Sequence, residues 1–331
     1  MQSADVTPSA YLGMDVAKEK VDCVLLVDAH SSYQVFANTP AGFEHLGDWL
    51  RREQVSSVHA CLEATGSYAE TLARTLLAQG HTVSVLNPAV LVTYRQSRNT
   101  RSKTDKLDAM LLAYYARERQ PRAWHPLPDE VTALRSLLAY RNDVQQTLLQ
   151  VRNRQRSGGL EPWVAGRLQT QIEQLVKEFK LVEQRIWKHL ETSATLSVTW
   201  SHLQTICGIG QLAAAHVIAQ IGEIERFDHP AALVSLAGLA VKQRESGSSL
   251  RGRGQMDRHG RSSLRRLLYM CALVAMRWDP HMRAWAQRLK ARGKPNKVVL
   301  VAVMRKLLHI IYGVWKHAKD YDAQLAFPVM A

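Results

Sequence analysis

The sequence predicts an α/β domain followed by a mainly helical region, and three observations support this class. Short apolar runs, separated by charged or serine-rich turns, crowd residues 11–37. Strand-like and helix-like segments then alternate as far as about residue 128. Beyond that point, apolar residues recur at the three- and four-residue spacings of amphipathic helices. We therefore expect a mixed sheet with helices first, and helices alone afterwards.

The first predicted domain, residues 1–128, has the element order β-β-β-α-β-α-β-α. Its predicted elements are strands over 11–17, 21–27 and 32–39, a helix over 40–52, a strand over 57–63, a helix over 68–79, a strand over 82–87 and a helix from about Thr104. The first three strands form a meander. The later strands need crossover helices to run parallel, so this order predicts a mixed sheet.

Two long amphipathic helices are predicted next, over residues 131–156 and 169–190, with a break at SGGLEPW. They would pair as an antiparallel coiled-coil arm (129–195) or dimer contact, and packing of each helix on its own domain is an equal alternative. The third predicted domain, 196–331, is helical and basic with one Gly/Ser/Arg-rich loop at 245–260. Trp278 and Trp285, seven residues apart, are expected on one packed helix stripe.

Basic residues are concentrated in the third domain. Lys and Arg outnumber Asp and Glu by 43 to 29 in the whole chain. The window 242–306 holds 17 basic and 3 acidic residues, so its excess of +14 equals the net charge of the chain. A block this dense, with Gly, Ser and Trp interleaved, favours the phosphate backbone of a nucleic acid over an ordinary solvated face.

Other functional classes receive no support. The four cysteines lie far apart without a C-x-x-C pair, which argues against a zinc knuckle and a disulfide framework. The N-terminus MQSADVTPSA has no apolar signal region, and the longest strongly apolar uncharged run, Leu267–Met276, is too short to span a bilayer. We expect a cytoplasmic protein with no membrane partner.

Four carboxylates stand where a metal site could form. Asp15 lies within the first strand, Glu63 ends the fourth, and Asp105 and Asp108 share one face at the start of a helix. Each alone reads as a cap, a helix-dipole partner or a strand-edge residue. Together they have the chemistry of phosphodiester cleavage, in which carboxylates hold divalent cations beside the phosphate. Hard oxygen ligands favour Mg²⁺ or Mn²⁺.

The segment TICGIGQLAAAHVIAQIG predicts two helices joined by a turn at Gly208 and Gly210, which resembles a helix-hairpin-helix DNA-binding element. A tight packing turn between apolar helices is the alternative. Downstream, Ser246, Ser248 and Ser249 share a loop with several arginines, and composition alone favours a phosphate-binding or flexible loop over a nucleophile. The further predicted nucleic-acid contacts are Lys242, Arg244, Ser248, Ser249, Arg251, Arg253, Arg258, Arg261, Arg265 and Arg266.

The acidic motifs resemble a known family. GMDVAKEK, LEATGSY, the Asn-Pro pair after the fifth strand and KTDKLDA are similar to the DEDD transposases of insertion sequences related to the Piv/MooV DNA invertases. The order of elements resembles the ribonuclease-H-like (RuvC-like) fold of Holliday-junction resolvases. This resemblance implies that Asp15, Glu63, Asp105 and Asp108 are a catalytic, metal-binding tetrad.

The same family has a second block of the form GL-x4-R-ESGSS-x-RG followed by LRR-x-LYM, which this chain carries between Gly238 and Met270. The resemblance implies that Ser246 attacks DNA, leaving a 5′-phosphoserine and a free 3′-hydroxyl. It also implies a structured noncoding RNA that pairs with donor and target DNA. Ala240-Val241 and Lys242-Gln243-Arg244 depart from the usual pattern, which affects local nucleic-acid contacts more than the chemistry.

The sequence thus predicts a transposase or site-specific recombinase with DNA, guide RNA and further copies of itself as partners. Because the acidic and serine blocks lie in different predicted domains, a composite site shared between protomers is a hypothesis of this sequence. Two alternatives stay open: a resolvase-like nuclease that uses the carboxylates and water, and a non-catalytic DNA-binding protein.

Overall fold

The computed structural model describes residues 10–64, 67–98, 102, 104–242, 245–246, 250–251, 255–257 and 260–327. The chain divides into two compact units between Pro126 and Leu127. The first unit is α/β. The second is helical among its described residues, apart from four strands of two residues each.

The sheet of the first unit has five strands in the order β3-β2-β1-β4-β5. The strands are β1 (Ala10–Val16), β2 (Lys20–Val27), β3 (His30–Ala37), β4 (His59–Glu63) and β5 (Thr82–Leu86). β1, β2 and β3 form an antiparallel meander, whereas β4 runs parallel to both β1 and β5. The predicted mixed sheet is therefore confirmed.

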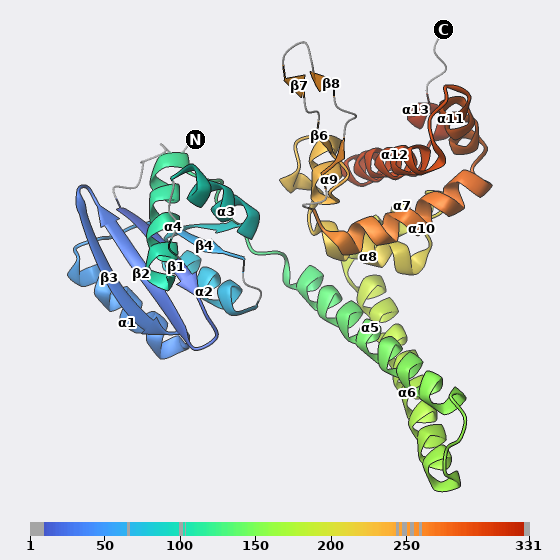
Figure 1. The fold of residues 1–331 in the computed structure, drawn as a ribbon, viewed down its shortest axis with the longest axis horizontal. Coiled ribbons are helices and arrows are strands. Elements are labelled where there is room, and N and C mark those ends of the chain that lie inside the picture. The colour runs from blue at the N-terminus through green and yellow to red at the C-terminus, as the bar shows by residue number, and fades with distance from the viewer. Residues whose placement is uncertain are drawn as a thin grey trace. The chain divides into compact units, whose positions relative to one another are not determined.

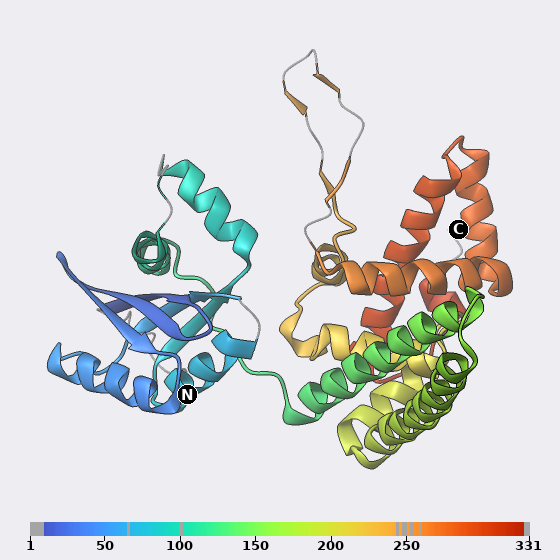
Figure 2. The same cartoon turned by 60° about the horizontal axis from the view of Figure 1, so that its bottom comes forward.

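Helices cover both faces of this sheet (Figures 1 and 2). One face packs against α1 (Pro40–Arg52) and α2 (Ser67–Ala78), and Leu12 and Met14 of β1 belong to that core. The other face packs against α3 (Pro88–Ser97) and α4 (Asp105–Arg119), and Tyr11 belongs to this second core. Successive side chains of a strand alternate between faces, so Asp15 lies on the α4 face.

Helix α3 is a correction to the sequence analysis, which expected no element between the fifth strand and Thr104. The Asn87 side chain caps α3 by accepting a hydrogen bond from the amide of Ala89 at 3.0 Å, and Pro88 takes the first helical position. The Asn-Pro pair therefore starts a helix as well as ending a strand.

The second unit begins with two long helices, α5 (Asp129–Arg156) and α6 (Pro162–Thr192), which lie side by side (Figures 1 and 2). They are antiparallel, because Arg141 binds Glu183 at 2.7 Å near one end and Gln155 binds Gln169 at 2.9 Å near the other. α6 starts at Pro162 rather than at residue 169. The base of the pair joins the main core of the unit, whereas a separate small cluster holds the far end together. That cluster comprises Leu148, Val151, Leu168 and Ile172.

The remaining helices of the second unit are α7 (Ala194–Gln204), α8 (Gln211–Ile221), a 3₁₀ turn (Ile224–Arg226), α9 (Pro230–Leu236), α10 (Ser262–Trp278), α11 (Pro280–Ala291), α12 (Asn296–His317) and α13 (Ala323–Ala326). Among them, α7, α9, α10 and α11 each pack against the apolar helix α12. α12 is the one helix among the described residues that is long and apolar enough to cross a membrane. Eight of its side chains are buried in the core of this unit, as expected of a central helix in a folded domain.

Two short ladders lie in, and just before, the segment predicted as a loop at 245–260. β6 (Val241–Lys242) pairs with β9 (Gln255–Met256), and β7 (Glu245–Ser246) pairs with β8 (Leu250–Arg251).

The expectation of one stripe for Trp278 and Trp285 is wrong. Asp279 caps a new helix and Pro280 starts it, so the two rings belong to α10 and α11. Trp278 is 64% exposed, whereas Trp285 packs on the core.

Candidate active site: a carboxylate cluster on the sheet

Adjacent strands place Asp15 and Glu63 beside each other. β1 and β4 run parallel with Met14 opposite Leu62, so the next residue of each strand is Asp15 and Glu63. Cys61, two residues before Glu63, belongs to the core on the α4 face. By alternation Glu63 points to the same face as Asp15. Both carboxylates therefore lie at the C-terminal ends of parallel strands.

Helix α4 brings the other two carboxylates to this face. Thr104 caps its start by accepting a hydrogen bond from the amide of Leu107 at 3.2 Å. Asp105 and Asp108 follow in the first turn, where a negative charge is favoured by the helix dipole. Asp105 is exposed, and Asp108 is only 6% exposed.

Gly13 permits the close approach of α4 to the sheet. A Cβ atom at this position would lie 1.9 Å from the carbonyl oxygen of Ala109 and 2.3 Å from the amide nitrogen of Ala113. Only a residue without a side chain fits there. Because Ala109 directly follows Asp108, this contact fixes the height of the acidic turn above Asp15.

The electrostatics of Asp15 show that the carboxylates interact. The pKa of Asp15 is raised from 3.8 to about 6, first by burial and then, in decreasing order, by the negative charges of Asp108, Asp105, Glu63 and Asp22. No described side chain donates a hydrogen bond to Asp15. The four residues predicted from the sequence thus form one cluster on the α4 face.

Asp22 is a fifth carboxylate that the sequence analysis missed. It lies directly opposite Asp15 in the β1–β2 ladder and is 2% exposed. The hydroxyl of Tyr33 donates to it at 2.5 Å, and the ammonium of Lys20 contacts it at 2.9 Å. The available signal was a charged residue inside the apolar run VDCVLLV, on the same side of the strand as Val24 and Leu26.

Two cations hold the aspartates of α4. The Lys20 ammonium lies 2.7 Å from Asp105, and a guanidinium nitrogen of Arg95, from α3, forms an ion pair with Asp108. Carboxylate oxygens are the ligands that Mg²⁺ and Mn²⁺ prefer, so the kind and number of groups suit a divalent cation. With the side chains as they stand, however, no three acidic, histidine or cysteine residues in the described ranges could hold one.

The predicted serine block lies partly outside the described residues. The backbone of Ser246 is in β7, opposite Leu250, while Lys242 and Arg251 are in β6 and β8. Their side chains are not among those described. Five arginine or serine positions of the prediction lie outside the residues that the structure describes. These are Arg244, Ser248, Ser249, Arg253 and Arg258.

Two of the other predicted nucleic-acid contacts have structural partners. Arg261 donates to the carbonyl of Gln220, and Arg265 donates to the carbonyl of Ala237 at 2.8 Å. Arg266 is exposed on α10. Because the two carbonyl-bound arginines fasten neighbouring segments of the second unit, their contact with nucleic acid stays a prediction.

The turn between α7 and α8 has a packing role. Gly208 has a φ of +95°, and a Cβ atom there would lie 2.5 Å from the carbonyl oxygen of Cys271 in α10. The alternative of a tight packing turn therefore accounts for Gly208. Gly210 caps α8, and a Cβ atom there would meet nothing within 4 Å, so it leaves an open helix N-terminus.

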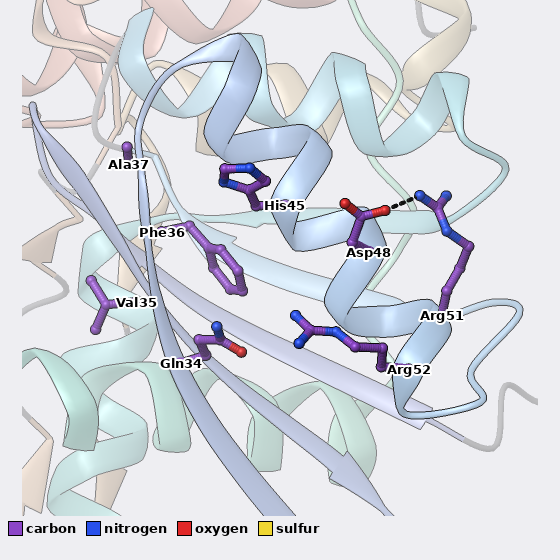
Figure 3. A pocket seen from close by; sticks show the side chains of 8 residues that line it. All are labelled: Gln34, Val35, Phe36, Ala37, His45, Asp48, Arg51 and Arg52. Atoms are coloured by element: carbon purple, nitrogen blue, oxygen red, sulfur yellow. Dashed lines mark hydrogen bonds and ion pairs between the residues drawn. The ribbon is translucent and has the colours of Figure 1, made fainter.

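A shallow hollow of about 700 Å³ lies between β3 and α1 (Figure 3). Phe36, which lines it, belongs to the core under α1. His45 and Arg52 of α1 also line the hollow, and Asp48 there forms an ion pair with Arg51. Since Phe36 and Asp15 point to opposite faces of the sheet, the hollow is separate from the carboxylate cluster.

Two separate parts of the chain match two family models. The first, described as "Transposase", is the DEDD transposase model of the IS110 group and matches residues 12–158. The second, described as "Transposase IS116/IS110/IS902 family", matches residues 201–287. The first match includes all four predicted carboxylates, and the second includes the serine block.

Relatives match over nearly the whole chain. The pilin gene-inverting protein of Moraxella bovis is 32% identical over 95% of this chain and 98% of its own length. A putative transposase of Sinorhizobium fredii is 24% identical over 94% of this chain and 90% of its own. Among solved structures, T. thermophilus RuvC in complex with a Holliday junction substrate is 12% identical and covers 35% of this chain, with a TM-score of 0.24.

These matches and the carboxylate cluster define the class of the protein as a DNA recombination enzyme. More narrowly, the chain belongs to the IS110 family of DEDD transposases. The predicted resemblance to transposases related to DNA invertases is confirmed.

Proposed function

We propose that this chain is the transposase of an insertion sequence, and that it cleaves and exchanges DNA strands at the carboxylate cluster with Ser246 as nucleophile. The observation that carries the proposal is the convergence of Asp15, Glu63, Asp105 and Asp108 on one face of the sheet. A structural role would not require like charges to be gathered in a half-buried place, because each raises the cost of ionising its neighbours.

The proposed cofactor is Mg²⁺, with Mn²⁺ as a substitute. Asp15, Glu63, Asp105 and Asp108 would hold it, and its chemistry there is to stabilise negative charge on the phosphate oxygens as the strand is cut. Asp15 must be ionised to act as a ligand. Since its pKa is about 6, this condition is met at neutral pH.

The proposed covalent step is a transesterification. The Ser246 hydroxyl oxygen bonds to the scissile phosphorus, and the bond from phosphorus to the 3′ oxygen breaks. The serine proton is lost to a base and the departing 3′ oxygen gains one, so no proton is consumed overall. The ester bond is kept as a 5′-phosphoserine, and attack by a 3′-hydroxyl reverses the step without ATP.

The finer assignments belong to the same proposal. Residues 1–128 are the ribonuclease-H-like domain, 129–195 a coiled-coil arm that contacts a second copy, and 196–331 the basic DNA-binding domain. An element-encoded RNA would select donor and target by base pairing, while the protein contacts backbone. The 17 basic residues between positions 242 and 306 supply the charge for such contacts. In this proposal the protein acts in the cytoplasm.

A covalent-capture assay tests the proposal. Purified full-length protein with any copurifying RNA is mixed with Mg²⁺ and labelled DNA that spans an element junction, and is then denatured. We expect a protein–DNA adduct that is lost in Ser246→Ala and in Asp105→Ala. Ser56→Ala, at an exposed serine of the first unit that is not among the predicted nucleic-acid contacts, is the control and should keep the adduct.

Two outcomes would contradict the proposal. Cleavage without an adduct, lost in Asp105→Ala but kept in Ser246→Ala, would identify a resolvase-like nuclease that uses water. DNA binding without cleavage in any variant, including wild type, would identify a non-catalytic DNA-binding protein.

A further inference from the structure

Each of the two aspartates in the first turn of α4 is paired with a cation from a different element of the first unit. Lys20, at the start of β2, contacts Asp105, and Arg95, in the last turn of α3, contacts Asp108. Neither Lys20 nor Arg95 belongs to the carboxylate tetrad. Both nevertheless place a positive charge next to a carboxylate of the cluster.

The contact of Arg95 with Asp108 is largely shielded from water. The Arg95 side chain is 18% exposed and that of Asp108 is 9% exposed. The Nε atom of Arg95 is buried and finds no hydrogen-bond partner in the described part of the chain. A buried N–H group without a hydrogen-bond partner costs free energy, so the position of Arg95 beside Asp108 is not the most favourable one for its guanidinium.

Lys20 bridges two carboxylates. Its ammonium lies 2.7 Å from Asp105 and 2.9 Å from the buried Asp22. Both contacts hold its pKa above the ordinary value for lysine. Asp22 is itself fixed by the Tyr33 hydroxyl, so it serves as an anchor that keeps the ammonium beside Asp105.

We infer that Lys20 and Arg95 are resident counter-ions, which hold Asp105 and Asp108 away from a common ligand point until a divalent cation displaces them. The inference rests on the metal dependence proposed above. It explains why the described carboxylates form one electrostatic cluster but hold no metal-binding geometry as they stand. Lys20 and Arg95 are in this sense positioning residues, since they act through the aspartates.

Competition between these cations and the metal predicts opposite changes in metal affinity and in the stability of the metal-free protein. Removing a counter-ion takes away both its repulsion of the incoming metal and its hold on the aspartate, so the metal should bind more tightly. At the same time the metal-free protein loses an ion pair and should become less stable or stay unchanged. A merely structural residue would lower metal affinity and stability together.

The test is a Mn²⁺ titration of the full-length protein, followed by electron paramagnetic resonance of free Mn²⁺. Binding that is lost in Asp15→Asn defines the site. We expect Lys20→Met to tighten this binding by roughly 30-fold, the effect of removing one unit charge about 4 Å from a doubly charged ion in bulk water. Lys18→Met is the matched control, because Lys18 is exposed on the same β1–β2 turn and should change the affinity by less than about twofold.

Arg95 is tested by two variants. Arg95→Lys keeps the charge and should bind Mn²⁺ as wild type does, whereas Arg95→Met should bind it more tightly. Urea denaturation of each variant without metal shows whether the protein is folded. If Arg95→Met is unfolded, the Lys20 pair of variants decides the question.

The outcomes separate this inference from the proposed function. Tighter binding in Lys20→Met than in Lys18→Met supports the counter-ion role. Unchanged or weaker binding in Lys20→Met overturns that role and leaves the metal dependence standing. If neither wild type nor any variant binds Mn²⁺ at the Asp15 site, both fail.

Discussion

Replacing Gly13 with alanine should separate α4 from the sheet and so dismantle the carboxylate cluster without touching an acidic residue. The added methyl group would lie 1.9 Å from the carbonyl oxygen of Ala109, whereas ordinary contacts begin near 3.4 Å. The neighbouring atoms are backbone, which cannot rotate aside. Either β1 or α4 must therefore move by more than about 1 Å.

Two effects follow from that movement. Overpacking of a buried site costs about 1–3 kcal/mol, and the steric conflict here, which involves backbone on both sides, belongs at the upper end. Asp108 adjoins the displaced residue, so the distance from its carboxylate to Asp15 changes by a similar amount. A misplacement of about 1 Å in a catalytic group can slow a reaction by about 100-fold.

Urea denaturation would measure the loss of stability, and cleavage of labelled junction DNA would measure the loss of activity. Gly166→Ala is the control, because Gly166 lies in the exposed part of α6 and a Cβ atom there meets nothing within 4 Å. That change should stabilise the protein by up to about 1 kcal/mol. Wild-type stability and cleavage in Gly13→Ala would refute the argument that this glycine sets the height of α4.

Three further predictions concern single side chains. The pKa of Asp15 is raised in the folded state, so the ionisation of Asp15 lowers the stability of the fold as the pH rises from about 4 to about 6. Asp15→Asn should therefore stabilise the metal-free protein by about 1 kcal/mol at pH 7 but not at pH 4, as measured by urea denaturation at both pH values. Tyr33→Phe removes the hydroxyl that donates to the buried Asp22, and should cost about 1 kcal/mol in the same assay at pH 7; an unchanged midpoint would mean that water replaces the hydroxyl. Ile186→Ala empties a fully buried position between α5, α6 and the main core, and should cost about 2–5 kcal/mol.

Much of the first unit could be predicted from the sequence, because its strands are short apolar runs and its helices carry an apolar face. Three helix starts were misread for one shared reason. α3, α6 and α11 each begin with a capping side chain followed by proline, at Asn87-Pro88, Glu161-Pro162 and Asp279-Pro280. In the first two cases the pair was taken as the end of a strand or part of a break, and in the third it was overlooked. Proline after Asn, Asp or Glu stops the preceding element and starts the next.

The tetrad could be predicted because its members lie in motifs, but its surroundings could not. Lys20 meets Asp105 only because α4 packs on β2, and Arg95 meets Asp108 only because α3 packs on α4. Such pairs are set by register and helix packing, which no local pattern contains. The position of the Ser246 side chain stays a prediction for a different reason, since it is not among those described.

Asp15 and Asp22 face each other across β1 and β2, but their surroundings differ. Asp22 is buried and has two partners, the Tyr33 hydroxyl, which donates a hydrogen bond to it, and the Lys20 ammonium. Asp15 is half-buried, has no described hydrogen-bond donor, and is surrounded by four other carboxylates that raise its pKa. An apolar side chain at Asp15 would remove this repulsion and pack on the same core as Tyr11. The fold gains nothing from an unpaired carboxylate at Asp15, whereas the neighbouring Asp22 has partners. We therefore infer that Asp15 serves to bind a ligand of opposite charge rather than to stabilise the fold.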